Sequence, residues 1–305
     1  SKQKKSDIKR WALALLMLAV AGGIFAALFV GLELLAEEVS PGDVYALALS
    51  PDQEILASSA SDGELQLWNL GNGTTTARAN IGYGISTMAW SPDGKFLAAA
   101  KYDGIKLISI PSLSTIRNLP DSRGDTLALC LDPDLTTLYS ISRTFGIDVW
   151  DINQGMRIGG LPGQSDRYLR SAEFSADCKR IITLDSSDAV PALTVYERIN
   201  METLSQVSFP DYNAPQLVGL NSNGSVAMGV KSSQVNTWHA KSGKPGKSSE
   251  LHYLYPRSLA LGRKNSRFAV GGMLGWIHLY DGNGKFIQSL RHGTSLGLAL
   301  VVLLE

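Results

Sequence analysis

The sequence predicts an all-β fold built from repeated units and preceded by one transmembrane α-helix. Two observations lead to this prediction: short apolar stretches that recur at intervals of about 41 to 46 residues, and an uncharged apolar run near the start of the chain. The chain has 305 residues, of which 44% are hydrophobic, so it can bury a large core. Its 28 basic and 28 acidic groups balance, which argues against a nucleic-acid partner.

The first 43 residues divide into three segments. Residues 1–10 are basic, residues 11–35 are apolar, and residues 36–43 form a short acidic linker. The first 22 residues of the apolar segment carry no charge and would span about 33 Å as a helix, which is enough to cross a bilayer. The segment is longer than a signal-peptide core and lacks a cleavage site, so the sequence predicts an uncleaved signal anchor.

The charges beside this segment predict its orientation. Positive residues stay on the cytoplasmic side of a membrane, and here they are Lys2, Lys4, Lys5, Lys9 and Arg10. The sequence therefore predicts a single-pass protein of the inner (cytoplasmic) membrane, with the rest of the chain in the periplasm or another extracytoplasmic compartment. An inward-facing body is the alternative.

Small residues form a stripe along the predicted helix. Such a stripe lets a second transmembrane helix approach closely, although small residues are also common in membrane helices in general. The stripe consists of Ala19, Gly23, Ala27 and Gly31.

The repeat is marked by a turn of the Ser-Pro-Asp type. It occurs at residues 50–53 and 91–94, and weaker forms of it continue to residue 265. An apolar stretch precedes each marker, a second follows it, and a third ends in an aromatic residue in most units. These blade-packing aromatics are Trp68, Trp150, Tyr196, Trp238 and Tyr280.

Four short strands per unit and six units predict a six-bladed β-propeller of four-stranded antiparallel blades at residues 44–295. The apolar stretch at 296–305 is either a C-terminal tail or closing strand, or the start of a seventh blade. Six blades are favoured, because a truncated seventh blade would expose an apolar edge.

The units resemble WD-repeat blades, in which the third strand ends in Trp-Asp. Trp150-Asp151 matches this dipeptide, and Trp68-Asn69 and Tyr280-Asp281 come close to it. No Gly-His dipeptide precedes any unit, so the resemblance implies blades without the family's buried Asp-His-Ser-Trp network, held by apolar packing. The units are equally similar to the six-bladed propellers of Tol-type periplasmic proteins.

Catalytic and metal-binding patterns are not found in the sequence. The four histidines have no metal-ligand spacing, and no nucleophile elbow or phosphate loop occurs. We therefore predict no catalytic, cofactor-binding or metal-binding residues and no enzymatic activity. Cys130 and Cys178 are predicted to be reduced and structural, with one disulfide between them as the alternative.

The propeller surface remains as the place of function. The fourth unit is longer than the others and carries extra loop length at residues 185–206, which is one candidate contact. The stretch 252–257, with Tyr253, Tyr255 and Arg257, is a second candidate. The sequence predicts a non-catalytic scaffold, assembly or stabilising subunit of a larger membrane complex, of respiratory, photosynthetic, transport or envelope type. Its partners would be other membrane subunits and the lipid bilayer. An extracytoplasmic binding or sensor module for a soluble ligand or peptide is the alternative, and a propeller hydrolase is the third.

Overall fold

The structure is a computed structural model that describes most of the chain from residue 42 to residue 293. The described residues are 42–120, 126–144, 146–161, 168–185, 190–209, 214–221, 224–251, 255–262 and 267–293. The chain divides into two units, Ser1–Ser40 and Pro41–Glu305, and all described residues belong to the second.

Several predicted segments lie outside the described residues. They are the basic segment, the apolar helix with its small-residue stripe, most of the linker, and the tail at 296–305. In the part of the chain that the structure describes, no helix has both the length and the apolar character needed to cross a bilayer.

The described residues form six antiparallel sheets of four consecutive strands each, as predicted. The strands of the first three blades are β1 (Val44–Leu49), β2 (Ile55–Ala60), β3 (Glu64–Asn69) and β4 (Thr74–Asn80); β5 (Thr87–Trp90), β6 (Phe96–Lys101), β7 (Gly104–Ser109) and β8 (Thr115–Pro120); β9 (Thr126–Leu131), β10 (Thr137–Ser142), β11 (Ile147–Asp151) and β12 (Met156–Leu161).

The other three blades follow the same order, and the sixth carries one short 3₁₀ helix between its second and third strands. Their elements are β13 (Leu169–Phe174), β14 (Arg180–Asp185), β15 (Ala192–Glu197) and β16 (Glu202–Ser208); β17 (Leu217–Leu220), β18 (Val226–Lys231), β19 (Gln234–His239) and β20 (Pro245–Glu250); β21 (Pro256–Leu261), β22 (Phe268–Gly272), η1 (Met273–Gly275), β23 (Trp276–Tyr280) and β24 (Phe286–Arg291).

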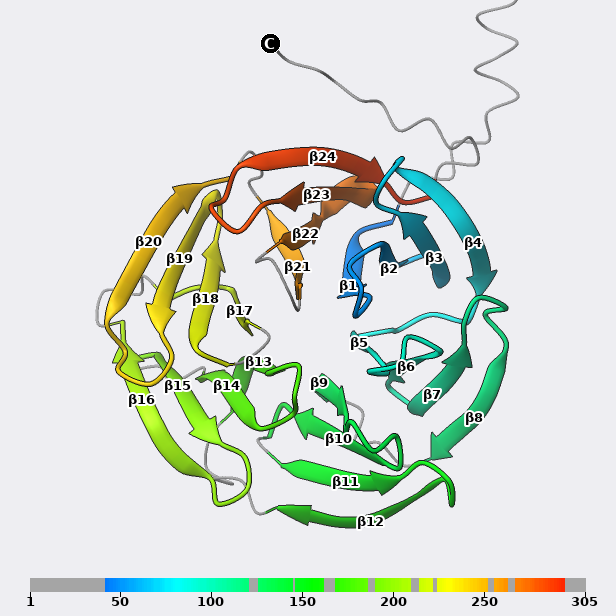
Figure 1. Ribbon diagram of the computed structural model, residues 1–305, viewed down its shortest axis with the longest axis horizontal. Coiled ribbons are helices and arrows are strands. Elements are labelled where there is room, and N and C mark those ends of the chain that lie inside the picture. The colour runs from blue at the N-terminus through cyan, green and yellow to red at the C-terminus, as the bar shows by residue number, and fades with distance from the viewer. Residues whose placement is uncertain are drawn as a thin grey trace, which may run out of the picture. The chain divides into compact units, whose positions relative to one another are not determined.

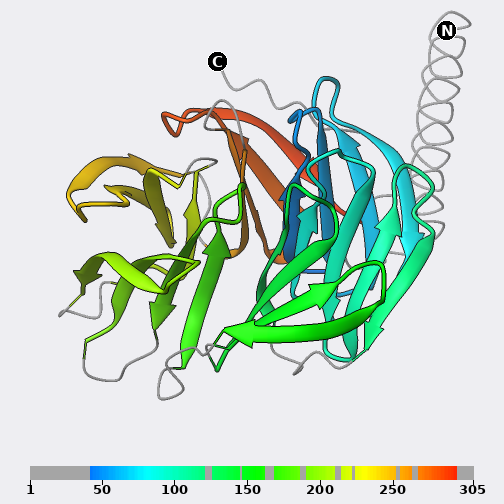
Figure 2. The ribbon, with the colours of Figure 1, turned by 60° about the horizontal axis from the view of Figure 1, so that its bottom comes forward.

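The six sheets are arranged radially around a common centre (Figure 1). The first strand of each blade lies innermost and the fourth lies on the circumference (Figure 1). Neighbouring sheets stand face to face (Figure 2), so the core is divided into apolar clusters between blades. The inner strands are buried almost throughout, whereas the outer strands alternate between exposed and partly buried residues. This difference is expected when the outer strand of each sheet faces solvent.

The repeated marker turn has a common hydrogen-bond pattern. In the first blade, the Ser50 hydroxyl donates to the Asp52 carboxylate and accepts the backbone N–H of Ile55 at 2.9 Å. Ser91 and Ser175 make the same pair of bonds in the second and fourth blades. These bonds satisfy the polar backbone of the reversal between the first two strands, which explains why the sequence repeats there.

The five aromatic residues at the ends of the third strands are all buried. In two blades the indole N–H also donates to a serine of the second strand. Trp68 Nε1 donates to Ser58 Oγ at 2.8 Å, and Trp150 Nε1 donates to Ser140 Oγ at 3.0 Å. A buried tryptophan N–H needs such a partner, so these serines are part of the blade core.

In the first blade this bond extends into a buried polar chain, which corrects the prediction that no Asp-His-Ser-Trp network can form. The Ser58 hydroxyl also contacts His292 Nδ1 at 2.8 Å, and His292 Nε2 lies 3.6 Å from Asp62 Oδ1. Since Ser58 accepts from Trp68, its own proton can donate to Nδ1, which leaves the ring proton on Nε2 facing the carboxylate. The sequence pattern missed His292 because it follows the sixth blade rather than preceding the first.

The charge on Asp62 fits this arrangement. Burial raises the pKa of the Asp62 carboxyl, but the hydrogen bond from His292 and the backbone N–H of Glu64 outweigh burial and lower the pKa below its usual value. The carboxylate therefore stays ionised at neutral pH and holds the imidazole in place.

The polar chain closes the ring. Each described blade uses its own four strands, so the junction of the sixth and first blades depends on contacts between sheets. At the same junction, the Ser258 hydroxyl donates to the Val44 carbonyl at 3.0 Å and Gln288 Nε2 donates to the Leu70 carbonyl at 3.1 Å. One apolar cluster spans the junction; its members are Val44, Leu47, Leu49, Leu56, Trp68, Leu70, Ala260, Ala269, Ile277, Leu279 and Leu290.

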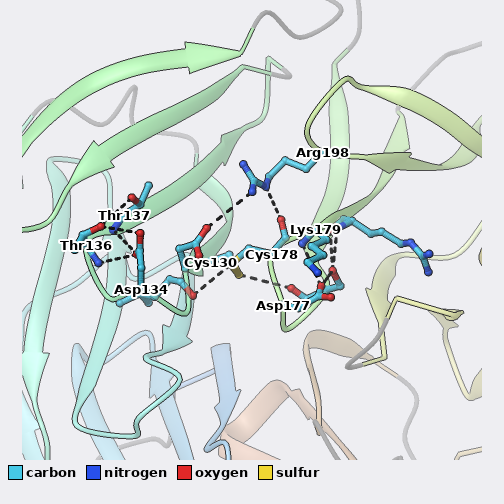
Figure 3. A network of polar contacts seen from close by, with 12 residues as sticks. Cys130, Asp134, Thr136, Thr137, Asp177, Cys178, Lys179 and Arg198 are labelled. Atoms are coloured by element: carbon cyan, nitrogen blue, oxygen red, sulfur yellow. Dashed lines mark hydrogen bonds and ion pairs between the residues drawn. A yellow bond between two sulfur atoms is a disulfide. The ribbon is translucent and has the colours of Figure 1, made fainter.

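The third and fourth blades are joined covalently. Cys130 on β9 and Cys178 in the turn before β14 form a disulfide, so the expectation that both thiols are reduced is wrong. Their separation of 48 residues leaves no local sequence signal for the bridge, which was only the alternative prediction. Arg198 lies beside the bridge (Figure 3) and donates to the Cys178 carbonyl, with its guanidinium 4.0 Å from the centre of the Tyr139 ring.

The buried chain makes a prediction about stability. Ser58→Ala leaves the buried Trp68 N–H and His292 Nδ1 without a partner, so it should lower the free energy of unfolding by about 2 to 4 kcal/mol. Ser59 is the matched control, because its buried hydroxyl has no hydrogen-bond partner among the described residues. Ser59→Ala should leave stability unchanged or raise it. Urea unfolding of both variants measures the difference, and equal losses would contradict the assignment.

The disulfide makes a second prediction. In protein unfolded by guanidinium without reductant, a thiol reagent should detect no free thiol, because the chain has only these two cysteines. Replacing both by serine should lower stability by up to about 4 kcal/mol, since the bridge restricts a long loop in the unfolded chain. Two titratable thiols per chain in the untreated protein would contradict the pairing.

Candidate interaction face

The direction of the strands assigns every loop to one of two faces. The loops between blades and the turns between second and third strands lie on one face, and the other turns lie on the opposite face. The first of these faces carries all the strongly exposed tyrosines of the described chain. We call it the tyrosine face, defined by Tyr45, Tyr83, Tyr102, Tyr168 and Tyr255.

The tyrosines come from five different loops or strand starts. Tyr83, Tyr168 and Tyr255 precede the inner strands β5, β13 and β21, and Tyr102 lies in the turn between β6 and β7. Tyr83, Tyr102 and Tyr255 expose 68%, 72% and 65% of their surface. Rings that are exposed to this degree contribute nothing to the core, so folding does not explain their presence.

The other exposed large apolar residues of the described chain do not gather on one face. Val190 and Leu274 also lie on the tyrosine face, whereas Ile199 lies in a turn of the opposite face. The rest lie on outer strands; they are Ile116, Met156, Ile158 and Ile287. Tyrosine is enriched in protein interfaces, because it offers a large apolar surface and a hydroxyl at a low entropic cost.

The mouth of the central channel lies at the middle of this face. Inner strands line it, and among the described lining residues Tyr45, Glu173 and Arg257 have titratable side chains. Arg257 Nε lies 3.7 Å from Asp43 Oδ2, so its charge is balanced locally. Burial raises the pKa of Glu173 to about 8, although the backbone N–H of Phe174 donates to this carboxylate at 3.0 Å and opposes the shift.

The contact residues predicted from the sequence do not all lie on the tyrosine face. Tyr255 and Arg257 lie on the tyrosine face, and Tyr253 lies outside the described residues. The stretch at 185–206, expected to be a long loop, consists mostly of strands β15 and β16 and their connecting turn. The apolar residues of β15 belong to the core of the fourth blade, whereas Val190 and Ile199 are exposed.

The other tyrosines were missed by the sequence analysis. Tyr45, Tyr83 and Tyr168 lie at the start of an inner strand or just before one, as Tyr255 does. In the strand registers Tyr45, Tyr83, Tyr168 and Tyr255 do not share one equivalent position, so no single position of the repeat marks them.

One group of side chains has a geometry that could hold a metal ion. Ligand atoms of Asp62, Glu64 and His292 lie within 4.8 Å of one another. His292 and Asp62 belong to the buried chain that closes the ring, and a Glu64 oxygen accepts from Gln66 Nε2 at 2.6 Å. These protein contacts account for the cluster without a metal.

The channel carboxyl makes a prediction about pH. The folded pKa of Glu173, about 8, lies above the ordinary value of 4.5. The stability that the neutral carboxyl allows is therefore fully present below about pH 4.5 and is lost as the pH rises to about 8. As the pH rises from 5 to 9, the urea midpoint of the wild type should decrease relative to that of Glu173→Gln. A difference between the wild type and Glu173→Gln that stays the same at every pH would contradict the assignment.

Comparison with known proteins gives the repeat a name. The family model "WD domain, G-beta repeat" (WD40) matches residues 37–69 and 76–105. These segments cover the first blade up to Trp68-Asn69 and the start of the second, so the predicted resemblance to WD repeats is confirmed there.

Curated relatives match parts of the chain. It is 33% identical to small ribosomal subunit protein RACK1z of Oryza sativa subsp. japonica over 106 residues, which is 32% of each chain. It is 27% identical to RACK1 of Schizosaccharomyces pombe over 122 residues, 37% of this chain and 39% of that one. It is 25% identical to transcription initiation factor TFIID subunit 5 of Caenorhabditis elegans over 150 residues, 48% of this chain and 22% of that one. The matches thus span less than half the length of these relatives.

These relatives correct three predictions. Their names place them in the small ribosomal subunit and in a transcription initiation factor, not in a membrane complex. The predicted role as a subunit of a membrane complex is therefore wrong. The predicted partners, which were membrane subunits and lipid but no nucleic acid, are wrong as well. So is the predicted location in the inner membrane with a periplasmic propeller. The apolar segment at 11–35 led to all three, and it lies outside the described residues.

Solved structures agree on the fold. The structure of U3-55K and that of the RRP9 WD40 repeats each match with a TM-score of 0.58 and 17% identity. The matches cover 82% of this chain and 82% and 81% of those chains. At this identity the likeness concerns fold alone. The chain is a six-bladed β-propeller that carries WD40 repeats.

Proposed function

We propose that this propeller is a non-catalytic platform that binds a partner protein through its tyrosine face. The observation that carries the proposal is the gathering of five exposed tyrosines on one face of a rigid ring. Burial of such rings against a partner removes apolar surface from water and allows each hydroxyl a hydrogen bond.

The surroundings of the tyrosines support binding rather than chemistry. Arg143 lies 5.6 Å from the centre of the Tyr168 ring, an arrangement that favours a fixed ring orientation. Arg257, two residues after Tyr255, places its guanidinium near the channel mouth, where Asp43 balances its charge. Arginine and tyrosine are both enriched among the residues that dominate interfaces. Tyr255 and Arg257, taken from the sequence as contact residues, are part of this proposal.

The relatives support membership of an assembly. Two are named as proteins of the small ribosomal subunit and one as a subunit of TFIID. A protein that works as one component among several needs a surface for its neighbours, and the tyrosine face is the surface of this chain best suited to that task.

The proposal is tested by removing rings from the face. A variant with Tyr83→Ala, Tyr102→Ala and Tyr255→Ala should fold with an unchanged melting temperature, because these rings are exposed. Its yield of co-purified partner, measured by quantitative mass spectrometry of the tagged protein from its own cells, should fall by about tenfold or more.

A matched variant controls for the loss of exposed apolar surface in general. It carries Ile116→Ala, Ile158→Ala and Ile199→Ala, three exposed residues that lie off the tyrosine face. This control should retain the partners that the tyrosine variant loses. Equal recovery from both variants, or a greater loss from the isoleucine variant, would contradict the proposal.

A further inference from the structure

The opposite face holds a cavity that the proposed function does not use. It has a volume of about 420 Å³, and it lies between the fifth blade, β17–β20, and the sixth, β21–β24. These blades are neighbours in the ring (Figure 2). The volume falls within the range of small-molecule sites, about 300 to 1,000 Å³.

The floor of the cavity is apolar. Side chains from both blades form it, and the largest are Met228 and Phe268, both of which are buried. Phe268 stacks on Tyr280, with the ring centres 5.0 Å apart, so this part of the floor is fixed. An aromatic or branched apolar group would remove this surface from water.

Glycines keep the cavity open. Gly246 and Gly284 stand on its two sides. A Cβ at Gly246 would lie 2.6 Å from Thr237 Oγ1, and a Cβ at Gly284 would lie 2.6 Å from the Ser249 Cβ. Gly284 also has φ +82°, a conformation that side chains disfavour. Larger residues at these positions would displace the cavity wall.

The rim of the cavity is polar and positively charged. Lys247 and His239 belong to it, and the stretch 239–247 holds three lysines and no acidic residue. Lys247 Nζ donates to the neutral amide oxygen of Asn283 at 3.0 Å and forms no ion pair with a described residue. The nearby Asp281 accepts backbone N–H groups of its own turn. The rim therefore offers a cation to a ligand.

We propose that this cavity binds a small organic anion, with an aromatic or branched apolar body on the floor and one carboxylate, sulfonate or phosphate group at Lys247. The apolar body gains from burial, and the anionic group gains a charge-assisted hydrogen bond from the ammonium. The site is separate from the tyrosine face, so either proposal can fail without the other.

The test uses two probes of similar shape, one anionic and one neutral. Isothermal titration of the full chain should show 2-naphthalenesulfonate binding at least about fivefold more tightly than the neutral 2-naphthalenesulfonamide. Lys247→Gln should remove this preference. Lys95→Gln, in a turn of the same face on the second blade, should keep it.

A cavity-filling variant locates the bound probe. Met228→Trp should abolish binding of both probes and keep the melting temperature, because the added ring enters empty space instead of packed core. If this variant does not fold, Val226→Phe, at the half-buried edge of the floor, replaces it. No binding of either probe by the wild type, or wild-type affinity in the folded cavity-filling variant, would overturn the proposal.

Discussion

The buried chain from Asp62 through His292 and Ser58 to Trp68 is the contact on which the closed ring depends. A propeller is stable only when its last sheet packs against its first, since an open ring exposes two apolar sheet faces. Here each described blade is made of consecutive strands, so no shared strand ties the ends of the ring. Hydrogen-bonded polar groups in a buried junction fix its geometry in a way that apolar contacts alone do not.

This closure also places the two candidate surfaces. Tyr45 and Tyr255 stand on the first and sixth blades, beside the junction and on the same face as His292. The disulfide between Cys130 and Cys178 holds the third and fourth blades on the far side of the ring. A rigid ring fixes loops that are far apart in sequence, and fixed loops lose little entropy when a partner binds.

The fold could be predicted from the sequence because its signals are local. The Ser50 turn and its repeats form hydrogen bonds within five residues, so the period could be read directly, and six blades were favoured over seven. His292 and Ser58 are separated by 234 positions, and the pairing follows only from closure of the ring. The tyrosine face is likewise a sum of separate loops, of which only the Tyr255 region was recognised. The membrane assignment rested on composition outside the described residues, and the relatives overturned it.

Hydrogen–deuterium exchange of a His292→Leu variant tests the closure most directly. Loss of the imidazole should speed amide exchange in β1–β4 and β21–β24, because the junction opens locally before the whole ring unfolds. The strands β9–β16, held by the disulfide on the other side, should keep the protection of the wild type. Faster exchange spread evenly over all six blades, or no change at the junction, would contradict the account.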